Sequence, residues 1–224
     1  MTVKISASII AAELVNIEKI VKQLEVAGVD IIHVDSMDGH FFHYIGLGPH
    51  VIKAIKKVAE IPVDVHLAVE EPERILSTFL ETGVDSISIQ LEACRFPLRV
   101  IRRIKSVGVK AGVAILPSTP ISQIAELVKY VDFVLLLSNN NSFFVEWHDA
   151  EFLPETFDRI RKLREIAKDY NIEIAVDGGV SKDIIPVLVK NGADILVMGR
   201  AVFQGDIEKN VKEIRSIIEE STRF

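Results

Sequence analysis

Four residues of the types that bind metal ions or transfer protons stand at the ends of three short apolar segments. His33 and Asp35 lie near the end of one segment, His66 ends a second, and Asp177 ends a third. Residues i and i+2 of a strand share a face, so His33 and Asp35 would project side by side. Imidazoles and carboxylates bind divalent metals, and carboxylates also act as general acids and bases. A metal or acid–base site is therefore expected if the fold brings the three segments together.

Short β-branched segments alternate with longer amphipathic segments along the chain, which is typical of strand–helix units around a parallel sheet. The expected strands are Lys4–Ile9, Ile31–Asp35, Val63–Leu67, Ser86–Gln90, Lys110–Ile115, Phe133–Leu137, Glu173–Val176 and Ile195–Met198. The helices that follow them are expected over Asn16–Ala27, Pro49–Val58, Glu73–Thr82, Pro97–Val107, Ile121–Tyr130, Pro154–Tyr170, Lys182–Lys190 and Ile207–Glu219. Eight such units fit the 224 residues as a single domain.

A glycine recurs between an expected helix and the next strand, at Gly28, Gly83, Gly108 and Gly192. Glycine in the left-handed conformation commonly ends a helix. Four such sites are not typical of an open sheet with one nucleotide-binding turn, and no G-x-G-x-x-G follows the first strand. The pattern favours a (β/α)8 TIM barrel over residues 1–224. In that fold the loops after the strands form the active face, so the four polar side chains are expected to converge there.

The composition excludes several classes of partner. A net charge of -6 leaves no basic face for nucleic acid or for an anionic membrane. No stretch of roughly eighteen apolar residues is free of charge, and the first residues lead straight into a strand rather than into a signal peptide. With Cys94 as its single cysteine, the chain cannot form an intramolecular disulfide. A cytoplasmic protein with a small-molecule ligand is therefore expected.

A single histidine or aspartate at the end of a barrel strand is often only a structural hydrogen-bonding group. Four together are different, because burying two carboxylates and two imidazoles without a cation would cost on the order of several kcal/mol. A bound cation is therefore expected. Asp38 stands before Gly39 and is expected to form a turn rather than to act as a fifth ligand.

Five motifs resemble the signatures of the ribulose-phosphate 3-epimerase family, and they occur in the family's order from Lys4 to about Phe203. They are His33–Gly39, Asp64–Leu67, Ala111–Val113 with Thr119–Pro120, Val176–Val180 and Gly199–Phe203. The resemblance implies a (β/α)8 barrel of the ribulose-phosphate-binding type that holds one divalent metal ion. The implied metal ligands are His33, Asp35, His66 and Asp177. Two histidines and two aspartates suit Zn, Mn or Fe(II), and the sequence does not choose among these metals.

The resemblance also implies a reaction and a phosphorylated ketose as substrate. Inverting a carbon next to a carbonyl requires one group that removes its proton and another that returns a proton to the opposite face. Asp35 and Asp177 are the expected pair, acting through a cis-enediolate that the metal stabilises. The expected reaction interconverts D-ribulose 5-phosphate and D-xylulose 5-phosphate. The substrate-binding residues are expected to be Ser8, Met37, Gly178, Gly179, Gly199 and Arg200.

The chain departs from the family's pattern around the substrate. The segment after the sixth strand, 138–147, contains three large aromatic residues and no glycine, so close approach of its backbone to a phosphate would be obstructed. Arg200 replaces a small residue and could supply charge to the phosphate, or could instead pair with Glu208. Further departures are Gln90 for a histidine, Leu116–Ser118 for Asn-Pro-Gly, and Ala68 and Leu137 for methionines.

These departures leave two further functions open beside the pentose-phosphate epimerase. One is a 3-epimerase of another ketose, phosphorylated or free. The other is a barrel that retains the metal and has lost epimerase activity. The exposed aromatic residues of 138–147 could also lie in the interface of a homo-oligomer.

Overall fold

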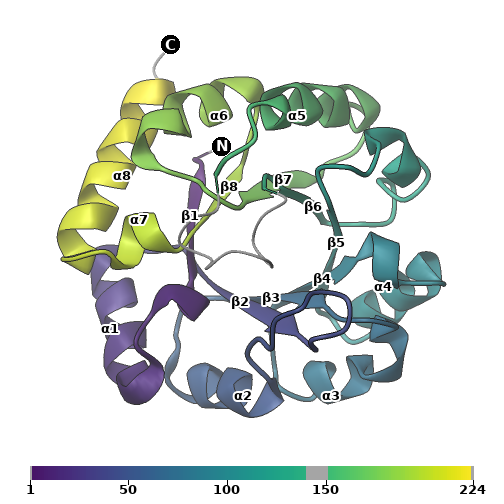
Figure 1. Cartoon of the computed structure of the whole chain (residues 1–224), viewed down its shortest axis with the longest axis horizontal. Coiled ribbons are helices and arrows are strands. Elements are labelled where there is room, and N and C mark those ends of the chain that lie inside the picture. Colours follow the sequence, from purple (N-terminus) through teal and green to yellow (C-terminus); the bar gives the residue numbers. More distant parts are fainter. Residues whose placement is uncertain (1, 140–150, 223–224) are drawn as a thin grey trace.

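The structure, a computed structural model, describes residues 2–139 and 151–222. Within these ranges, parallel strands close into one barrel in sequence order, and helices surround it (Figure 1). The strands are β1 Lys4–Ser8, β2 Ile31–Met37, β3 Val63–Ala68, β4 Ser86–Gln90, β5 Lys110–Ile115, β6 Phe133–Leu137, β7 Glu173–Asp177 and β8 Ile195–Met198. The predicted (β/α)8 TIM barrel is confirmed.

The outer layer consists of helices and of short 3-10 turns. The α-helices are α1 Ile17–Ala27, α2 Pro49–Val58, α3 Leu76–Leu80, α4 Pro97–Lys105, α5 Glu155–Ile166, α6 Ile185–Asn191, α7 Arg200–Phe203 and α8 Ile207–Thr222. The 3-10 turns are η1 Ile9–Ala11, η2 Leu14–Asn16, η3 Pro72–Arg74, η4 Leu91–Ala93, η5 Ile121–Ile124 and η7 Lys182–Ile184. In the described ranges, no helix combines the length and the apolar character that crossing a bilayer requires.

Helix α4 shows how the sequence produces the outer layer. Pro97 occupies its first turn, where a missing N–H costs nothing. Val100, Ile101 and Ile104 are buried against the barrel. Three basic residues stand in the last turn, where they complement the partial negative charge of the helix end.

The prediction of an α-helix over Ile121–Tyr130 is wrong. Only η5 is regular there. The residues that follow it form turns whose backbone hydrogen bonds mostly join residues three apart, such as the bond from the Leu127 N–H to the Ile124 carbonyl at 2.8 Å. Ile121, Ile124 and Val128 are buried as the apolar pattern indicates. Apolar residues at i, i+3 and i+7 have the α-helical period, but a series of irregular turns can bury the same residues, so the period alone does not determine the backbone.

The predicted glycine repeat is confirmed. All four glycines have φ between 81° and 99°, in the left-handed region that glycine adopts without strain. At Gly28 and Gly192 the glycine N–H bonds back to the last turn of α1 and α6. Each glycine thus ends an outer segment shortly before the next strand begins.

The barrel interior has a polar half and an apolar half. Alternate residues of β1 to β4 supply polar groups: Ser6, Ser8, His33, Asp35, Asp64, His66, Ser86, Ser88 and Gln90. The strands β5 to β8 supply apolar residues that pack together: Ala114, Phe133, Leu135, Leu137, Ala175, Ile195 and Val197. Gly112 makes room for this packing, because a Cβ there would lie 2.4 Å from the Phe133 ring.

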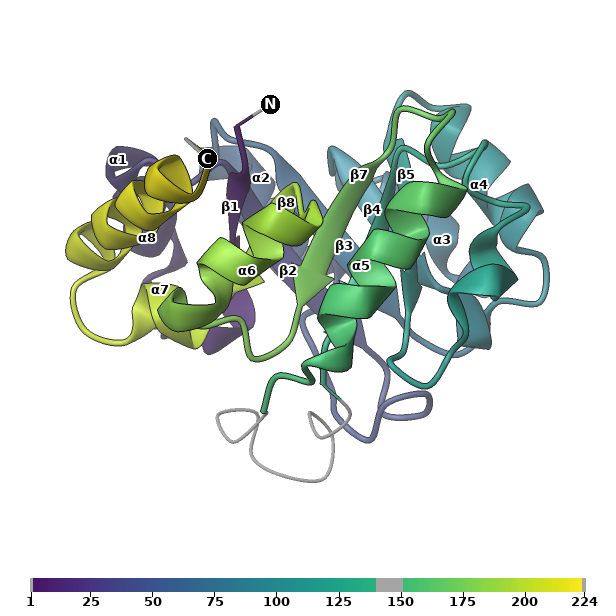
Figure 2. The same cartoon turned by 90° about the horizontal axis from the view of Figure 1, so that it is seen from above.

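A repeated aspartate clamp closes the edge of the barrel where the strands begin, the edge near the N-terminus (Figure 2). Each clamp aspartate precedes an even-numbered strand and accepts a backbone N–H at the start of the strand before it, at 2.7–2.8 Å. The aspartates are Asp30, Asp85, Asp132 and Asp194. Each aspartate also forms an ion pair with a basic residue of the helix that packs before the first strand of the pair. Asp30 pairs with Arg215 of α8, Asp85 with Lys56 of α2, Asp132 with Lys105 of α4 and Asp194 with Arg164 of α5. The clamps therefore tie the strands together in pairs, away from the predicted site.

Candidate metal centre and active site

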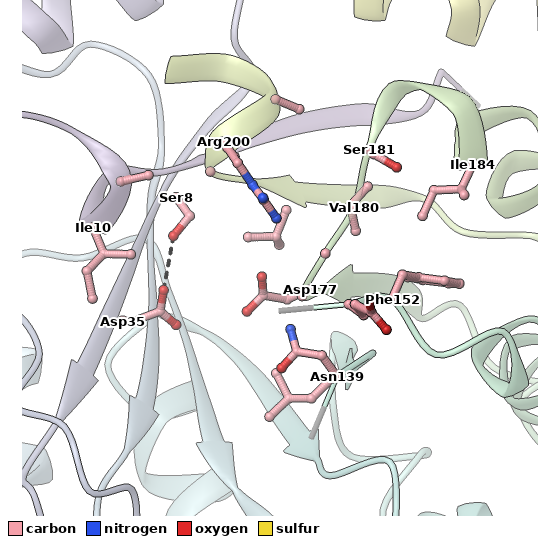
Figure 3. Close-up of a pocket in the computed structure, with 18 of the residues that line it drawn as sticks. Ser8, Ile10, Asp35, Asn139, Phe152, Asp177, Val180, Ser181, Ile184 and Arg200 are labelled. Atoms are coloured by element: carbon pink, nitrogen blue, oxygen red, sulfur yellow. Dashed lines mark hydrogen bonds between the residues drawn. The ribbon is translucent and has the colours of Figure 1, made fainter. Parts of the chain in front are cut away.

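The four predicted metal ligands come together at the edge of the barrel where the strands end. His33, Asp35, His66 and Asp177 each offer a ligand atom, and these atoms all lie within 4.8 Å of one another. The two histidines are buried, and the two aspartates are partly exposed to the cavity above them. In Figure 3 the carboxylates of Asp35 and Asp177 face each other from different strands. This cluster could hold one metal ion.

The strand register produces this convergence. His33 and Asp35 lie two residues apart on β2, so both point into the barrel. Asp35 is the register partner of His66 on β3, which places the two side chains next to each other. Asp177 ends β7 on the other side of the barrel, beside Leu137 of β6. Three strands that are far apart in sequence thus supply one site.

One oxygen of Asp35 lies at the centre of the cluster. Asp35 Oδ1 is 3.2 Å from His33 Nε2 and 3.2 Å from His66 Nδ1. Its other oxygen accepts a hydrogen bond from Ser8 Oγ at 3.0 Å (Figure 3). Ser8 therefore fixes the orientation of the carboxylate from β1.

Each histidine uses its second ring nitrogen for a partner outside the cluster. His33 Nδ1 lies 2.8 Å from Asp64 Oδ2, and Asp64 also accepts the Ser86 hydroxyl. His66 Nε2 lies 2.8 Å from Gln90 Oε1. Metal-binding histidines commonly donate their outer N–H to an oxygen in this way.

The donor set fits a divalent cation. When the outer nitrogens carry the hydrogens, the inner nitrogens of both neutral rings direct lone pairs at Asp35 Oδ1. Two lone pairs facing a carboxylate oxygen at 3.2 Å repel it unless a proton or a metal ion lies among them. Two imidazole nitrogens and two carboxylates are ligands that Zn, Mn and Fe(II) all accept.

In the absence of a metal ion, the pKa values of three cluster residues differ strongly from their ordinary values. Burial alone would lower the pKa of His33, but the charge of Asp35 and the hydrogen bonds to Asp35 and Asp64 raise that pKa well above its ordinary value. Burial likewise opposes ionisation of Asp35, but the charges and hydrogen bonds of His33 and His66 outweigh it, so the pKa of Asp35 is lowered. Burial and then the charge of Asp35 raise the pKa of Asp177 to about 6. A cation bound here would replace the proton held by the histidine.

A cavity of about 1330 Å³ opens above the cluster, which is ample for a sugar phosphate. The predicted substrate-binding residues Ser8, Met37, Gly178, Gly179, Gly199 and Arg200 all line it. Its apolar wall includes Ile10, Phe152, Val180 and Ile184 (Figure 3). The structure thus places every predicted substrate-binding residue on one cavity, and their roles stay a prediction.

Comparison with known proteins identifies the family. The sequence profile of the Ribulose-phosphate 3 epimerase family matches residues 4–203. The ribulose-phosphate 3-epimerase of Bacillus subtilis is 37% identical over 217 residues, which cover 95% of this chain and 98% of that protein. The ribulose-phosphate 3-epimerase of Methanocaldococcus jannaschii is 39% identical over 216 residues, which cover 95% and 90%. The chain belongs to the ribulose-phosphate 3-epimerase family. It is an isomerase of the epimerase type.

Solved structures outside this family share the fold. KGPDC from Streptococcus mutans has a TM-score of 0.72 at 11% identity, and 98% of this chain and 99% of that chain are covered. The 3-hexulose-6-phosphate synthase from Salmonella typhimurium has a TM-score of 0.71 at 17% identity, with coverage of 99% and 100%. At these identities the likeness concerns the barrel alone.

The structure locates several of the residues in which the chain departs from the epimerase family's pattern. Arg200 begins α7, and its side chain extends toward the cavity (Figure 3). In the described ranges no carboxylate lies within 4.0 Å of its guanidinium, so the alternative pairing with Glu208 is absent there. Ser138 donates a hydrogen bond to the carbonyl of Asp177 at 2.8 Å, whereas residues 140–147 lie outside the described ranges. Asp38 forms a turn as predicted, because its carboxylate accepts the N–H groups of His40, Phe41 and Glu70.

Two kinds of residue near the centre were not predicted from the sequence. Asp64 was available from pattern, because it stands two residues before His66 and therefore shares its face. Asn139 is buried against Gly178, where a Cβ would lie 2.2 Å from its Nδ2, and Figure 3 shows it beside Asp177. Glu92 bonds to Gln90 and to the loop after β5. Periodicity does not indicate contacts between loops, so no sequence signal pointed to Glu92 or Asn139.

Proposed function

We propose that the protein is a metal-dependent epimerase that interconverts D-ribulose 5-phosphate and D-xylulose 5-phosphate. One observation carries the proposal: Asp35 and Asp177 face each other across the cavity while both belong to the same ligand cluster. A carbon held between them would have one carboxylate on each face. Membership of the epimerase family supports the same reaction.

The two aspartates perform the proton transfers. One carboxylate removes the proton from C3 of the ketose, and the other delivers a proton to the opposite face, which inverts the carbon. The step passes through a cis-enediolate of the sugar, and the reverse reaction exchanges the two roles. The hydrogen bond from Ser8 keeps the Asp35 carboxylate aimed at the substrate carbon.

His33, Asp35, His66 and Asp177 would hold the metal. When bound, the metal supplies positive charge beside the carbonyl and hydroxyl oxygens of the substrate, where negative charge develops. The histidines contribute no proton transfer, because their outer nitrogens are engaged by Asp64 and Gln90. Zn, Mn and Fe(II) all remain compatible with this donor set.

The phosphate would lie at the end of the cavity formed by the loops after β7 and β8. Gly178 and Gly179 follow β7 with φ of 111° and 68°, a backbone conformation that can turn N–H groups toward an anion. Gly199 follows β8, and a Cβ there would lie 3.0 Å from that of Ala11. Arg200 adds a guanidinium at the same end. Met37 and Ser8 also line the cavity, and Ser8 lies between the ligand cluster and Gly199, because it donates a hydrogen bond to Asp35 and a Cβ at Gly199 would lie 4.0 Å from its Cβ.

The decisive experiment is an epimerase assay in deuterated water with protein of measured metal content. Transfer between two carboxylates predicts that xylulose 5-phosphate formed from ribulose 5-phosphate carries solvent deuterium at C3. The metal-stripped protein should be inactive and should regain activity on adding back Zn, Mn or Fe(II). Metal-bound protein that epimerises another ketose but not ribulose 5-phosphate would contradict the proposed substrate, and metal-bound protein inactive on every ketose would contradict the reaction.

A further inference from the structure

The buried contact between His66 and Gln90 determines which nitrogen of His66 is free to bind a metal. Gln90 ends β4 with no exposed surface, and its Oε1 lies 2.8 Å from His66 Nε2. An amide can present either its oxygen or its nitrogen to an imidazole, and the two orientations impose opposite tautomers. Whatever fixes the amide therefore also fixes the histidine.

Glu92 fixes the amide. Gln90 Nε2 lies 2.5 Å from Glu92 Oε2, and a carboxylate only accepts hydrogen bonds, so the amide nitrogen must face Glu92. The amide oxygen is then left for His66. This orientation follows from the hydrogen-bonding chemistry of the three groups.

Glu92 is itself held by the loop after β5. Its Oε1 accepts the Leu116 N–H at 2.9 Å and the Thr119 hydroxyl. The Arg159 guanidinium from α5 in turn binds the carbonyls of Leu116, Pro117 and Thr119, at 2.7–2.9 Å. The orientation of Gln90 is thus determined by contacts that begin on the outer layer of the barrel.

We infer that Gln90, oriented by Glu92, is a positioning residue that holds His66 as the Nε2–H tautomer and presents its Nδ1 lone pair to the ligand cluster. The inference rests on the proposed metal site. It also separates the two histidines: the outer N–H of His33 meets the carboxylate of Asp64, whereas that of His66 meets a neutral amide. On the outer side of His66, the nearest carboxylate is one group further away, because Gln90 stands between Nε2 and Glu92.

The first test reads the tautomer directly. In metal-free protein at mildly alkaline pH, ring-nitrogen NMR should show hydrogen on Nε2 of His66. Gln90→Leu keeps the size of the side chain and removes the acceptor, so the tautomer preference should weaken. Glu92→Gln keeps all side-chain volumes and frees the Gln90 amide to turn over, so a mixture of tautomers is expected.

The second test measures the affinity for Zn²⁺ by competition with a chromophoric chelator. Gln90→Leu should weaken binding about 10–100-fold, the usual effect of removing a partner that orients a metal ligand. With Co²⁺ as the probe, the visible absorption spectrum should shift as the His66 ligand moves.

A reversed pair provides the rescue. In the double variant Gln90→Glu with Glu92→Gln, a carboxylate accepts the His66 N–H, and the new amide at 92 donates to it. The new amide oxygen still accepts from Leu116 and Thr119. All hydrogen bonds and the total charge are kept, so the tautomer and most of the Zn²⁺ affinity should return, whereas Gln90→Glu alone places two carboxylates together and should not restore them.

Ser88→Ala is the matched control. Ser88 is the register partner of His66, lies on β4 two residues before Gln90, and is fully buried. Its hydroxyl has no hydrogen-bond partner among the described residues. This variant should leave the tautomer and the Zn²⁺ affinity unchanged.

The outcomes separate the inference from the proposed function. A wild-type protein that binds no Zn²⁺ would contradict the metal site, while the tautomer of His66 would still test the role of Gln90. Wild-type binding with an unchanged tautomer and unchanged affinity in both Gln90→Leu and Glu92→Gln would overturn the inference. If Gln90→Leu fails to fold, Glu92→Gln and the reversed pair decide it.

Discussion

Asp35 and Asp177 share one buried cluster, yet their pKa values are displaced in opposite directions. Two histidines stabilise the ionised form of Asp35, whereas Asp177 meets burial and the negative charge of Asp35. The metal-free cluster therefore combines an ionised carboxylate with one that holds its proton up to a pH of about 6. A cation bound to the cluster would favour the ionised form of both carboxylates, so this asymmetry belongs to the metal-free protein.

The replacement of either aspartate should abolish turnover without unfolding the barrel. Asp35→Asn and Asp177→Asn would each remove one of the two proposed proton carriers and one negative charge from the proposed metal site, so kcat should fall by about 10²–10⁴-fold or more. Circular dichroism should show an intact barrel. Asp183→Asn is the control, since Asp183 lines the cavity but lies outside the cluster. Near-normal turnover in either cluster variant would refute the two-carboxylate assignment.

The isolated protein should carry about one divalent ion per chain, as measured by elemental analysis, because the cluster offers one complete set of four ligands. Fully active protein without metal would contradict this prediction.

Metal affinity should rise with pH, because the ion must displace the proton of His33, whose pKa is raised well above its ordinary value. The expected change is about tenfold per pH unit for each proton released. Below about pH 6, Asp177 is protonated as well and should release a second proton. Calorimetry in buffers of different ionisation enthalpy counts these protons. The Asp177→Asn variant should not release the second proton. If this variant and the wild type released the same number of protons, the result would be inconsistent with the raised pKa of Asp177.

The same shifts give the metal-free protein a defined dependence of stability on pH. Folding favours protonated Asp177, so its contribution is greatest below the ordinary pKa of 3.8 and declines as the pH rises toward about 6. The contribution of His33 is present below pH 6.5 and disappears as the pH rises through its raised pKa. The pKa of Asp35 is lowered instead, so its contribution to stability is present above its ordinary pKa of 3.8 and is lost as the pH falls below that value. Thermal melts across this range, with and without metal, should show the metal-free protein losing stability above neutral pH.

Arg200→Ala should raise the KM for a phosphorylated ketose by at least about tenfold, or about 1.4 kcal/mol, with a smaller change in kcat. A guanidinium can form a bidentate, charge-assisted pair with a phosphate, and Arg200→Lys should retain part of the effect. The unphosphorylated sugar is the control substrate and should respond little. Equal effects on both sugars would rule out a contact between Arg200 and the phosphate.

The aspartate clamps should contribute to stability and leave the metal site unaffected. Asp85→Ala removes the acceptor for the Val63 N–H, at a cost of about 1–2 kcal/mol, or about 2–8 °C in Tm. Asp85→Asn keeps an acceptor and loses only the partly exposed pair with Lys56, so its effect should be smaller. Zn²⁺ affinity measured on both variants should match the wild type, and a loss of affinity would show that the two edges of the barrel are coupled.

The sequence was sufficient for the barrel and for the convergence of four polar side chains, because both depend on simple periods. Alternating segments predicted the strands, and spacing of two residues together with strand ends predicted that His33, Asp35, His66 and Asp177 would meet. The register that sets Asp35 beside His66 then follows from the parallel barrel.

Contacts between loops could not be predicted in the same way. Glu92 accepts hydrogen bonds from Gln90 and from Leu116, which follows Glu92 by 24 residues in the sequence. These contacts depend on how two loops fold against each other. The short helix α7 was not expected, because four residues show no helical period. The direction of Arg200 likewise depends on how α7 leaves β8, and the sequence left it open between the cavity and Glu208.

The aspartate clamps also divide the ring of strands into four modules, each with a helix before its first strand. The first module is completed by α8, which supplies Arg215, so the two ends of the chain belong to the same module. The seams between modules fall in the loops after β2, β4, β6 and β8, at the opposite edge from the clamps. In the sequence, Ser138 directly follows β6 and Arg200 follows β8, so two of the departures from the family's pattern begin after the second strand of a module. A change in one of these loops therefore leaves both strands of every clamped pair, and the aspartate that joins them, in place.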